Sequence, residues 1–308
     1  MAEPILSASR PGRSAFRLAT EKGIEWWLLF CAAVSVLTTV GILYVLFSNS
    51  FQFFREVSVF EFLFGTNWSP AFVPPSFGVL PLIVGTVMIV VIAGVIALPI
   101  GSAIGIYLSE YATTTQRKLI KPFLEILAGI PTIVYGYFAL TFITPMIRKV
   151  IPEIEIFNGL SAGIVVGIMI LPMVASLAED ALRAVPNSLR QGAYALGASS
   201  YQVSLNIVFP AALSGVSSAF ILALSRAFGE TMAVTIAAGG SPKMTLNPLE
   251  SIQTMTAYIV GVSKGDNPVG TTGYYTLYAV ALVLFLITFG MNVIANRIQR
   301  RYREVYDH

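Results

Sequence analysis

The sequence predicts an all-α integral membrane protein with six transmembrane helices. The 308 residues are 56% hydrophobic and only 11% charged, whereas soluble globular domains carry about 25% charged residues. The mean hydropathy of the chain is +0.76. The apolar runs are much longer than the roughly ten residues of a transmembrane β-strand, so we expect helical spans rather than a barrel.

The apolar runs divide the chain into two tails, a leading span and a core. We expect cytoplasmic tails at residues 1–25 and 297–308. Residues 26–78 should form the first span (26–47) and then an outer loop that contains a short helix (57–64). The core, residues 79–296, then holds five further spans, which we expect at 80–108, 122–146, 159–177, 207–238 and 273–295. Between them we expect a polar loop at 109–121 and an outer loop with one short re-entrant or surface helix at 239–272.

Two pairs of glycines lie within the expected spans at a spacing of four residues. The pairs are Gly101 with Gly105 and Gly163 with Gly167. Small residues at this spacing let transmembrane helices approach each other closely. We therefore interpret both pairs as contacts between packed helices.

The distribution of Lys and Arg predicts the orientation of the chain in the membrane. Segments 1–25, 109–122, 179–206 and 297–308 hold 13 of the 19 basic residues, and the loops on the other side hold 5. Cytoplasmic loops collect Lys and Arg, so both termini are expected in the cytoplasm. The remaining basic residue, Arg226, falls inside an expected span.

The composition excludes several classes of function. The single cysteine, Cys31, allows no disulfide within the chain, and the single histidine, His308, is the terminal residue. A His/Cys metal site or a Ser/His/Asp site is therefore not expected. The chain has no Gly-rich phosphate loop for ATP hydrolysis, and its net charge of +3 gives no sign of nucleic-acid binding. We expect no metal, no cofactor and no enzymatic activity.

The segment that organises the chain is RAVPNSLRQGAYALGASSYQVSLNIVFP, residues 183–210, because it is neither apolar nor a plain loop. Pro186 suits the start of a helix, and Gly197 suits its end. Ser199 or Ser200 then suits the cap of a second helix. We call residues 183–206 the coupling segment and expect a helix, a glycine turn and another helix that docks into a cleft on a partner protein.

The spacing in this segment resembles the "EAA" signature of ABC-importer permeases. That signature has Glu-Ala-Ala, three residues, Gly, nine residues and Ile-x-Leu-Pro; the matching positions here are Gln191, Gly192, Ala193, Gly197, Ile207 and Pro210. Gln191 and Phe209 depart from the residue types of the signature. The resemblance implies a type I ABC-importer permease (MetI-like) architecture, with the coupling helices seated on an ATP-hydrolysing subunit. An ordinary amphipathic loop helix is the alternative.

Arg226 and Glu230 form a charged pair inside the expected fifth span. Residues four apart in a helix share one face, about 6 Å apart along the axis. A charge at membrane depth persists only with a partner or a polar cavity. Two interpretations remain open: an ion pair that is only structural, or an anion pathway in which Arg226 attracts the anion and Glu230 limits its grip.

Four further stretches, 77–86, 107–111, 127–136 and 226–231, resemble the phosphate ABC-importer permeases. Residues 62–66, followed by Trp68 and Pro70, are similar to the PstC-type rather than the PstA-type subunit of that family. The resemblance implies a multi-pass subunit, embedded in the lipid of a bacterial or archaeal cell (inner) membrane, that carries inorganic phosphate across that membrane. Its implied partners are a cytoplasmic ATPase dimer, a second related permease of the PstA type and an extracytoplasmic phosphate-binding protein.

Three alternatives to a phosphate permease remain. A permease for sulfate, molybdate or phosphonate would carry the same coupling segment. An ion-coupled secondary carrier would need no cytoplasmic docking helix. A membrane-embedded enzyme would need histidines or clustered carboxylates at membrane depth, which this sequence lacks.

Overall fold

The computed structural model describes residues 15–265 and 268–303, and the chain divides into two compact units, residues 1–48 and 49–308. Residues 1–14 and 304–308 of the two expected tails lie outside the described residues. The first unit holds most of α1 (Ala15–Glu56), a helix of 42 residues. α1 contains the expected first span and extends beyond it at both ends, because the flanking Leu, Ala, Glu and Lys residues also favour helix.

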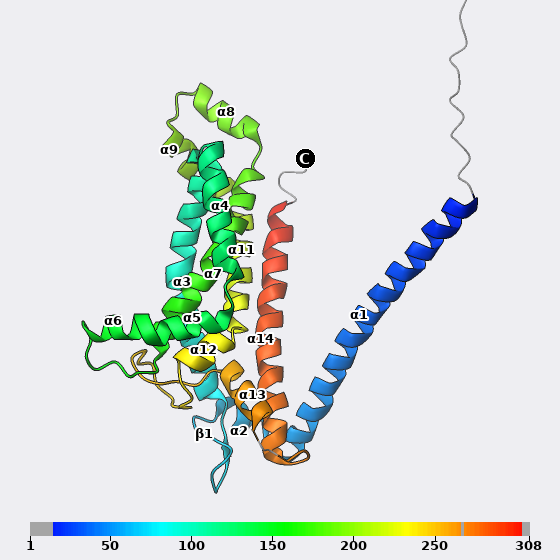
Figure 1. The fold of residues 1–308 in the computed structure, drawn as a ribbon, viewed down its shortest axis with the longest axis vertical. Helices are drawn as coiled ribbons and strands as arrows, with labels where there is room; N and C mark the ends of the chain where they lie inside the picture. The colour runs from blue at the N-terminus through cyan, green and yellow to red at the C-terminus, as the bar shows by residue number, and fades with distance from the viewer. Residues whose placement is uncertain (1–14, 266–267, 304–308) are drawn as a thin grey trace, which may run out of the picture. The chain divides into compact units, whose positions relative to one another are not determined.

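Four long helices of the second unit run side by side (Figure 1). They are α3 (Leu80–Ile106), α7 (Gly159–Arg183), α11 (Leu213–Phe228) and α14 (Thr272–Arg303). α7 packs against both α3 and α11, and α11 also packs against α14. Their common core is aliphatic, and Val165, Val166 and Ile170 of α7 are fully buried in it.

The glycine pairs of α3 and α7 bring these two helices into close contact, as predicted. A Cβ atom on Gly101 would lie 2.6 Å from Cγ1 of Val174, and one on Gly163 would lie 2.6 Å from Cβ of Ile92. Both distances are too short for a real contact. A larger residue at either position would therefore force α3 and α7 apart.

Among the described residues, four helices are long and apolar enough to cross a membrane, and two bent helix pairs raise the number to six if each pair is one span. The four are Thr20–Glu56, Leu80–Tyr111, Gly159–Arg183 and Thr272–Ile298. The two pairs are Thr114–Gly129 with Thr132–Arg148, and Ser200–Ala211 with Leu213–Phe228. The helical fold class and the six expected spans agree with this arrangement.

The expected polar loop at 109–121 is wrong. α3 continues as the π-helical segment η1 (Tyr107–Tyr111), and after Ala112 and Thr113 the chain enters α4 (Thr114–Gly129). Thr113 and Gln116 form a capping box at the start of α4, in which each side chain bonds the backbone N–H of the other residue. A T-x-x-Q pattern of this kind favours the start of a helix. The charged residues Arg117, Lys118 and Lys121 favoured a loop instead, so the helix was not predicted.

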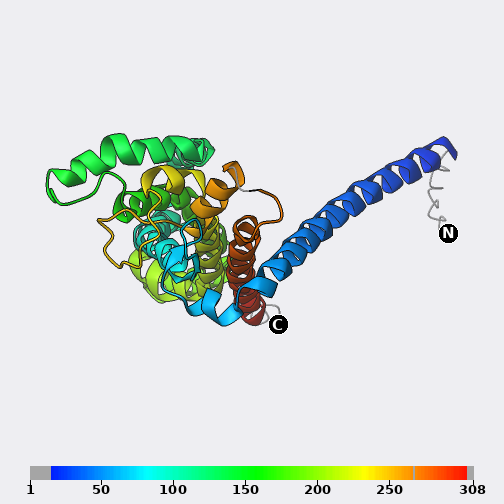
Figure 2. The same cartoon turned by 90° about the horizontal axis from the view of Figure 1, so that it is seen from below.

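The expected third span is not one straight helix. α4 and the following helices, α5 (Thr132–Phe138), η2 (Ala139–Ile143) and α6 (Thr144–Arg148), meet at an angle of 87°. Figures 1 and 2 show α5 and α6 lying across the direction of the bundle. The break falls at Ile130 and Pro131, because the proline ring disfavours helical backbone in the residue before it. Ile130 accordingly has an extended ψ of 129°.

The expected fifth span is interrupted twice. The expected span begins within η3 (Val203–Val208), which follows α9 (Ser200–Gln202) and leads into α10 (Phe209–Ala211). Together these three helices meet α11 at an angle of 69°. α11 then ends at Phe228, and α12 (Met232–Ala237) follows after a break. α12 packs on α5, where a Cβ on Gly136 would lie 2.9 Å from Cβ of Ile236. The two broken spans therefore meet each other beside the bundle.

The end of the second unit away from the coupling segment is closed by aromatic packing. It contains α2 (Val59–Phe64), the antiparallel strands β1 (Trp68–Ser69) and β2 (Ser76–Phe77), and α13 (Met255–Lys264). Trp68 is buried and meets the ring of Tyr258 edge-on, with 4.8 Å between the ring centroids. The short helices expected at 57–64 and within 239–272 are thus confirmed as α2 and α13.

Candidate functional site

The coupling segment has the helix–turn–helix form that the sequence predicts. Pro186 is the N-cap residue of α8 (Asn187–Ala195), and Gly197 follows that helix with a φ of +82°, a conformation that glycine adopts without strain. Ser199 starts α9 with a capping box: its Oγ accepts from the N–H of Gln202 (3.4 Å), and Oε1 of Gln202 accepts from the N–H of Ser199 (2.9 Å). α8 and α9 lie together at one end of the bundle (Figure 1).

Four of the six signature residues come together on α8 and its turn. Gln191, Gly192 and Gly197 are exposed, and Ala193 is half-buried. Ile207 and Pro210 instead lie in η3 and α10, where the chain turns into α11. Near these four residues, Leu196 is 90% exposed and Tyr201 is 66% exposed. These exposed apolar side chains make α8, its turn and α9 a surface suited to a protein partner.

Arg226 and Glu230 do not lie on one helix, so the predicted geometry of this pair is wrong. Arg226 is in the last turn of α11, whereas Glu230 lies beyond the end of that helix, after Gly229. Within the described part of the chain, no ion pair of 4.0 Å or less joins the two. Glycine before Glu230 was the sequence signal for a helix end.

Glu230 is a buried side chain that organises the joint between α11, α12 and α13. Its Oε1 accepts a hydrogen bond from the N–H of Ala233 in the first turn of α12 (3.2 Å). Its backbone carbonyl accepts from Oγ1 of Thr256 in α13 (2.8 Å). The carboxylate thus satisfies one of the free N–H groups at the start of α12.

Arg226 lines a cavity between α4, α7 and α11, which we call the polar cavity because four of its lining side chains are charged. The cavity has a volume of about 370 Å³, and Lys121, Glu125, Ser176 and Glu179 line it together with Arg226 and apolar side chains. A cavity needs only about 10–15 Å³ of space open to the centre of a water-sized sphere to hold one water. There is therefore room for an oxyanion with several waters.

Glu179 of α7 is a charged residue of this cavity that no sequence pattern indicated as part of a site. Its side chain is 0% exposed and pairs with Arg117 of α4, with Lys121 of α4 (Nζ to Oε2, 3.1 Å) and with Arg183 of α7 (Nη1 to Oε1, 3.9 Å). A buried carboxylate costs several kcal/mol unless it is paired. The sequence shows that Arg117 and Lys121 lie four residues apart, and that Glu179 and Arg183 do so as well. It does not show that the cations of α4 pair with the carboxylate of α7.

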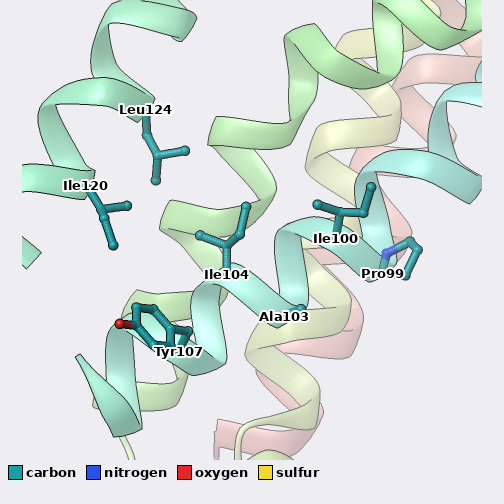
Figure 3. A pocket seen from close by; sticks show the side chains of 7 residues that line it. All are labelled: Pro99, Ile100, Ala103, Ile104, Tyr107, Ile120 and Leu124. Carbon is teal, nitrogen blue, oxygen red and sulfur yellow. The ribbon is translucent and has the colours of Figure 1, made fainter. Parts of the chain in front are cut away.

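A second cavity beside α4 is apolar. It has a volume of about 560 Å³ between α3 and α4, and its lining is Pro99, Ile100, Ala103, Ile104, Tyr107, Ile120 and Leu124. Figure 3 shows Ile120 and Leu124 of α4 facing Ile104 of α3 across it. An anion would lose its hydration there without gaining hydrogen bonds. Of these two cavities, only the one beside Arg226 suits an anion.

Helices that can cross a membrane, a cavity with charged side chains beside broken spans, and an exposed helix–turn–helix surface at one end are together the arrangement of a transmembrane transport subunit. The chain belongs to the family of binding-protein-dependent transport system inner membrane components, whose model matches residues 97–304. Proteins of this family are permease subunits rather than enzymes, and they work with a separate ATP-hydrolysing subunit and a binding protein.

Curated relatives match the chain over most of its length. It is 34% identical over 261 residues to the probable ABC transporter permease protein YqgH of Bacillus subtilis, with 84% of each chain covered. It is 33% identical over 315 residues to the phosphate transport system permease protein PstC of Mesorhizobium japonicum, with 95% of each covered. A probable PstC protein of Methanocaldococcus jannaschii is 31% identical, over 87% of this chain and 92% of the relative.

Solved structures share the fold at low sequence identity. A bacterial ABC transporter involved in the import of the acidic polysaccharide alginate matches with a TM-score of 0.62 and 13% identity, over 92% of this chain and 99% of the other. An inward-facing MetNI methionine ABC transporter matches with a TM-score of 0.53 and 19% identity, over 73% and 94%. The type I ABC-importer permease architecture expected from the coupling segment is thus confirmed.

Proposed function

We propose that this chain is the PstC-type permease subunit of an ATP-driven importer of inorganic phosphate. The observation that carries the proposal is the placement of Arg226 in the polar cavity between α4, α7 and α11. The relatives named PstC, one of which matches 95% of the chain, support the choice of phosphate. In this proposal residues 79–296 form the transport core of a bacterial or archaeal cell membrane protein whose termini are both cytoplasmic.

Charge balance in the cavity suits transient binding of an anion. Lys121 and Arg226 line the cavity together with the carboxylates of Glu125 and Glu179. Close to Glu179 but outside the lining, Arg117 and Arg183 add two positive charges and Asp180 adds one negative charge. The guanidinium of Arg226 matches two phosphate oxygens at once. The nearby carboxylates keep the net positive charge small, and an anion that binds weakly is able to leave on the other side.

The coupling segment supplies the ATP-dependent step of the proposed cycle. An ATPase dimer docks on Gln191, Gly192, Ala193 and Gly197, with one ATPase under this chain and the other under a PstA-type permease. A phosphate-binding protein delivers the ion at the end that holds α2 and α13. The closing of the ATPases moves the coupling segments and opens the two ends of the pathway in turn.

Uptake of labelled phosphate tests the proposal. Membrane vesicles that hold the complete wild-type transporter, its binding protein and internal ATP should accumulate phosphate, and excess sulfate, molybdate or a phosphonate should compete poorly. Phosphate uptake without ATP would instead support an ion-coupled carrier. Uptake of sulfate, molybdate or phosphonate but no phosphate would assign the chain to another oxyanion.

Gly192 offers a clean test of the docking role. A Cβ at Gly192 would meet no atom within 4 Å and the residue is exposed, so we expect Gly192→Trp to leave this chain's own packing intact. The indole should instead obstruct the ATPase, and a disrupted interface anchor costs about 2 kcal/mol. We expect stimulated ATPase activity and uptake to fall roughly thirtyfold. Gly192→Ala, which fits the same space, is the matched control and should behave like wild type; equal activity of both variants would contradict docking here.

Glu230 should act through its hydrogen bond rather than its charge. In Glu230→Gln the amide oxygen still accepts from the N–H of Ala233, so we expect uptake within about threefold of wild type. In Glu230→Ala that N–H loses its partner, and both the yield of assembled complex and uptake should fall further. Loss of uptake by a fully assembled Glu230→Gln transporter would show that the negative charge itself is required in the pathway.

A further inference from the structure

The end of α3 is joined to the coupling segment by polar contacts that the proposed pathway does not use. η1 continues α3 and contains Glu110, whose side chain is 7% exposed although it lies at a helix end. Leu108, two residues earlier, is 1% exposed. η1 is therefore anchored in the protein on one side and presents a nearly buried carboxylate on the other.

Arg190 of α8 binds that carboxylate with two parallel hydrogen bonds. Its Nε donates to Oε2 of Glu110 (3.2 Å), and its Nη2 donates to Oε1 (2.9 Å). The same guanidinium donates from Nη2 to the carbonyl of Leu182 (2.8 Å), and from Nη1 to the carbonyl of Val185 (2.6 Å) and to Oδ1 of Asn187 (3.4 Å). The side chain of Arg190 is only 14% exposed.

These contacts use all five N–H groups of the guanidinium. They hold α8 both to the end of α3, through Glu110 of η1, and to the end of α7, through Leu182. A planar, bidentate pair of this kind resists rotation as well as separation, because two bonds must lengthen together. A lysine at position 190 could supply the charge but not the fork.

The other arm of the coupling segment touches the same turn of η1. Oγ of Ser204, in η3, donates to the carbonyl of Ser200 (2.7 Å) and lies 3.2 Å from the hydroxyl oxygen of Tyr111, whose O–H can donate to it. η1 is thus bound by α8 through Glu110 and by η3 through Tyr111. Two polar contacts therefore connect the coupling segment to the end of α3.

We propose that the Glu110–Arg190 pair transmits the movement of α8 to α3 during transport, and that both residues are positioning residues for the coupling of ATP hydrolysis to phosphate movement. This inference rests on the proposed docking of an ATPase on α8. α3 packs along α7 through Gly101 and Gly105. A pull on η1 therefore acts on the α3–α7 pair, which carries Glu179 and one wall of the polar cavity.

The test compares phosphate uptake with ATP hydrolysis in vesicles that hold the complete transporter with its binding protein. Glu110→Gln should still hydrolyse ATP within about twofold of wild type but move about tenfold less phosphate per ATP, because the neutral amide cannot form the charge-assisted bidentate pair with Arg190. For Arg190→Lys, the amount of phosphate moved per ATP should lie between the values for wild type and for Glu110→Gln. For Tyr111→Phe, the amount of phosphate moved per ATP should fall by no more than about twofold, because the hydrogen bond that is lost joins two uncharged groups. Lys118→Gln, which changes an exposed lysine of α4, is the control and should keep the wild-type ratio.

A purely structural pair would give a different pattern. Fully assembled Glu110→Gln and Arg190→Lys transporters with the wild-type ratio of phosphate to ATP would overturn the inference. If Glu110→Gln does not assemble, Glu110→Asp decides: it keeps the charge but is one methylene shorter, and an unchanged ratio would again overturn it. A wild-type transporter that imports another oxyanion would refute the phosphate assignment alone, since the same ratios are then measured with that ion.

Discussion

Vesicles that hold the complete transporter with Arg226→Gln should import phosphate roughly thirtyfold more slowly than wild type. A hydrogen bond to a charged group is worth about 1.5–3 kcal/mol, and a loss of about 2 kcal/mol corresponds to that factor. Arg226 is exposed at the cavity and carries no packing role in the core, so the variant should insert and assemble normally. The measurement is the initial rate of labelled-phosphate uptake beside the ATPase rate.

Two controls separate loss of the anion site from loss of charge in general. Arg226→Lys keeps the positive charge without the fork and should recover part of the rate. Lys149→Gln removes one exposed positive charge just after α6, outside the cavity lining, and should leave uptake unchanged. Lost uptake with ATPase activity still stimulated by the loaded binding protein places Arg226 in the anion path. Loss of both activities would show that Arg226 acts in coupling or assembly instead.

Local patterns predicted the helical spans and the coupling segment because their signals lie within a few residues. Pro186, Gly197 and Ser199 determine helix ends through their own backbone or side-chain chemistry, and the structure has all three ends where they were expected. The glycine pairs were similarly readable, since their small size has one main consequence between helices in lipid.

The expectations for α4 and for the two broken spans were wrong because the local sequence pattern there is compatible with two different structures. The charges at the start of α4 suggested a loop, but a helix that ends near the membrane surface can carry charges on an exposed face. Pro131 and Gly229 were both visible inside spans, yet a proline or glycine either kinks a membrane helix or ends it, depending on the neighbours that satisfy the freed backbone groups. Here α5 and α12 pack on each other and stabilise both breaks.

The role of Glu179 could not be predicted, because its partners are distant in sequence. Arg117 and Lys121 lie on α4, about 60 residues away, and only the folded arrangement brings them to α7. The same holds for Glu110 and Arg190, which are 80 residues apart. A single sequence contains no record of such pairs, whereas spacings of three or four residues on one helix are directly visible.

Glu179→Gln should lower the melting temperature of the assembled transporter by roughly 10 °C. The carboxylate is 0% exposed and faces three cations, so its removal leaves Arg117, Lys121 and Arg183 in mutual repulsion. Breaking a buried ion pair from one side costs about 3–5 kcal/mol, and 1 kcal/mol shifts the midpoint by about 2–4 °C in a chain of comparable size. α4 should detach first, because none of its residues is buried in an apolar core.

A compensating change tests the electrostatic cause of that loss. Arg117→Gln added to Glu179→Gln removes one of the unbalanced cations, so the double variant should melt at a higher temperature than Glu179→Gln alone. Asp180→Asn, at the exposed neighbouring position, should shift the midpoint by less than about 2 °C, as an exposed ion pair is worth little. If the double variant melts lower than Glu179→Gln, the arginine stabilises α4 by contacts other than the carboxylate. α4 would then be attached by packing rather than by charge, and the buried carboxylate would serve the anion path alone.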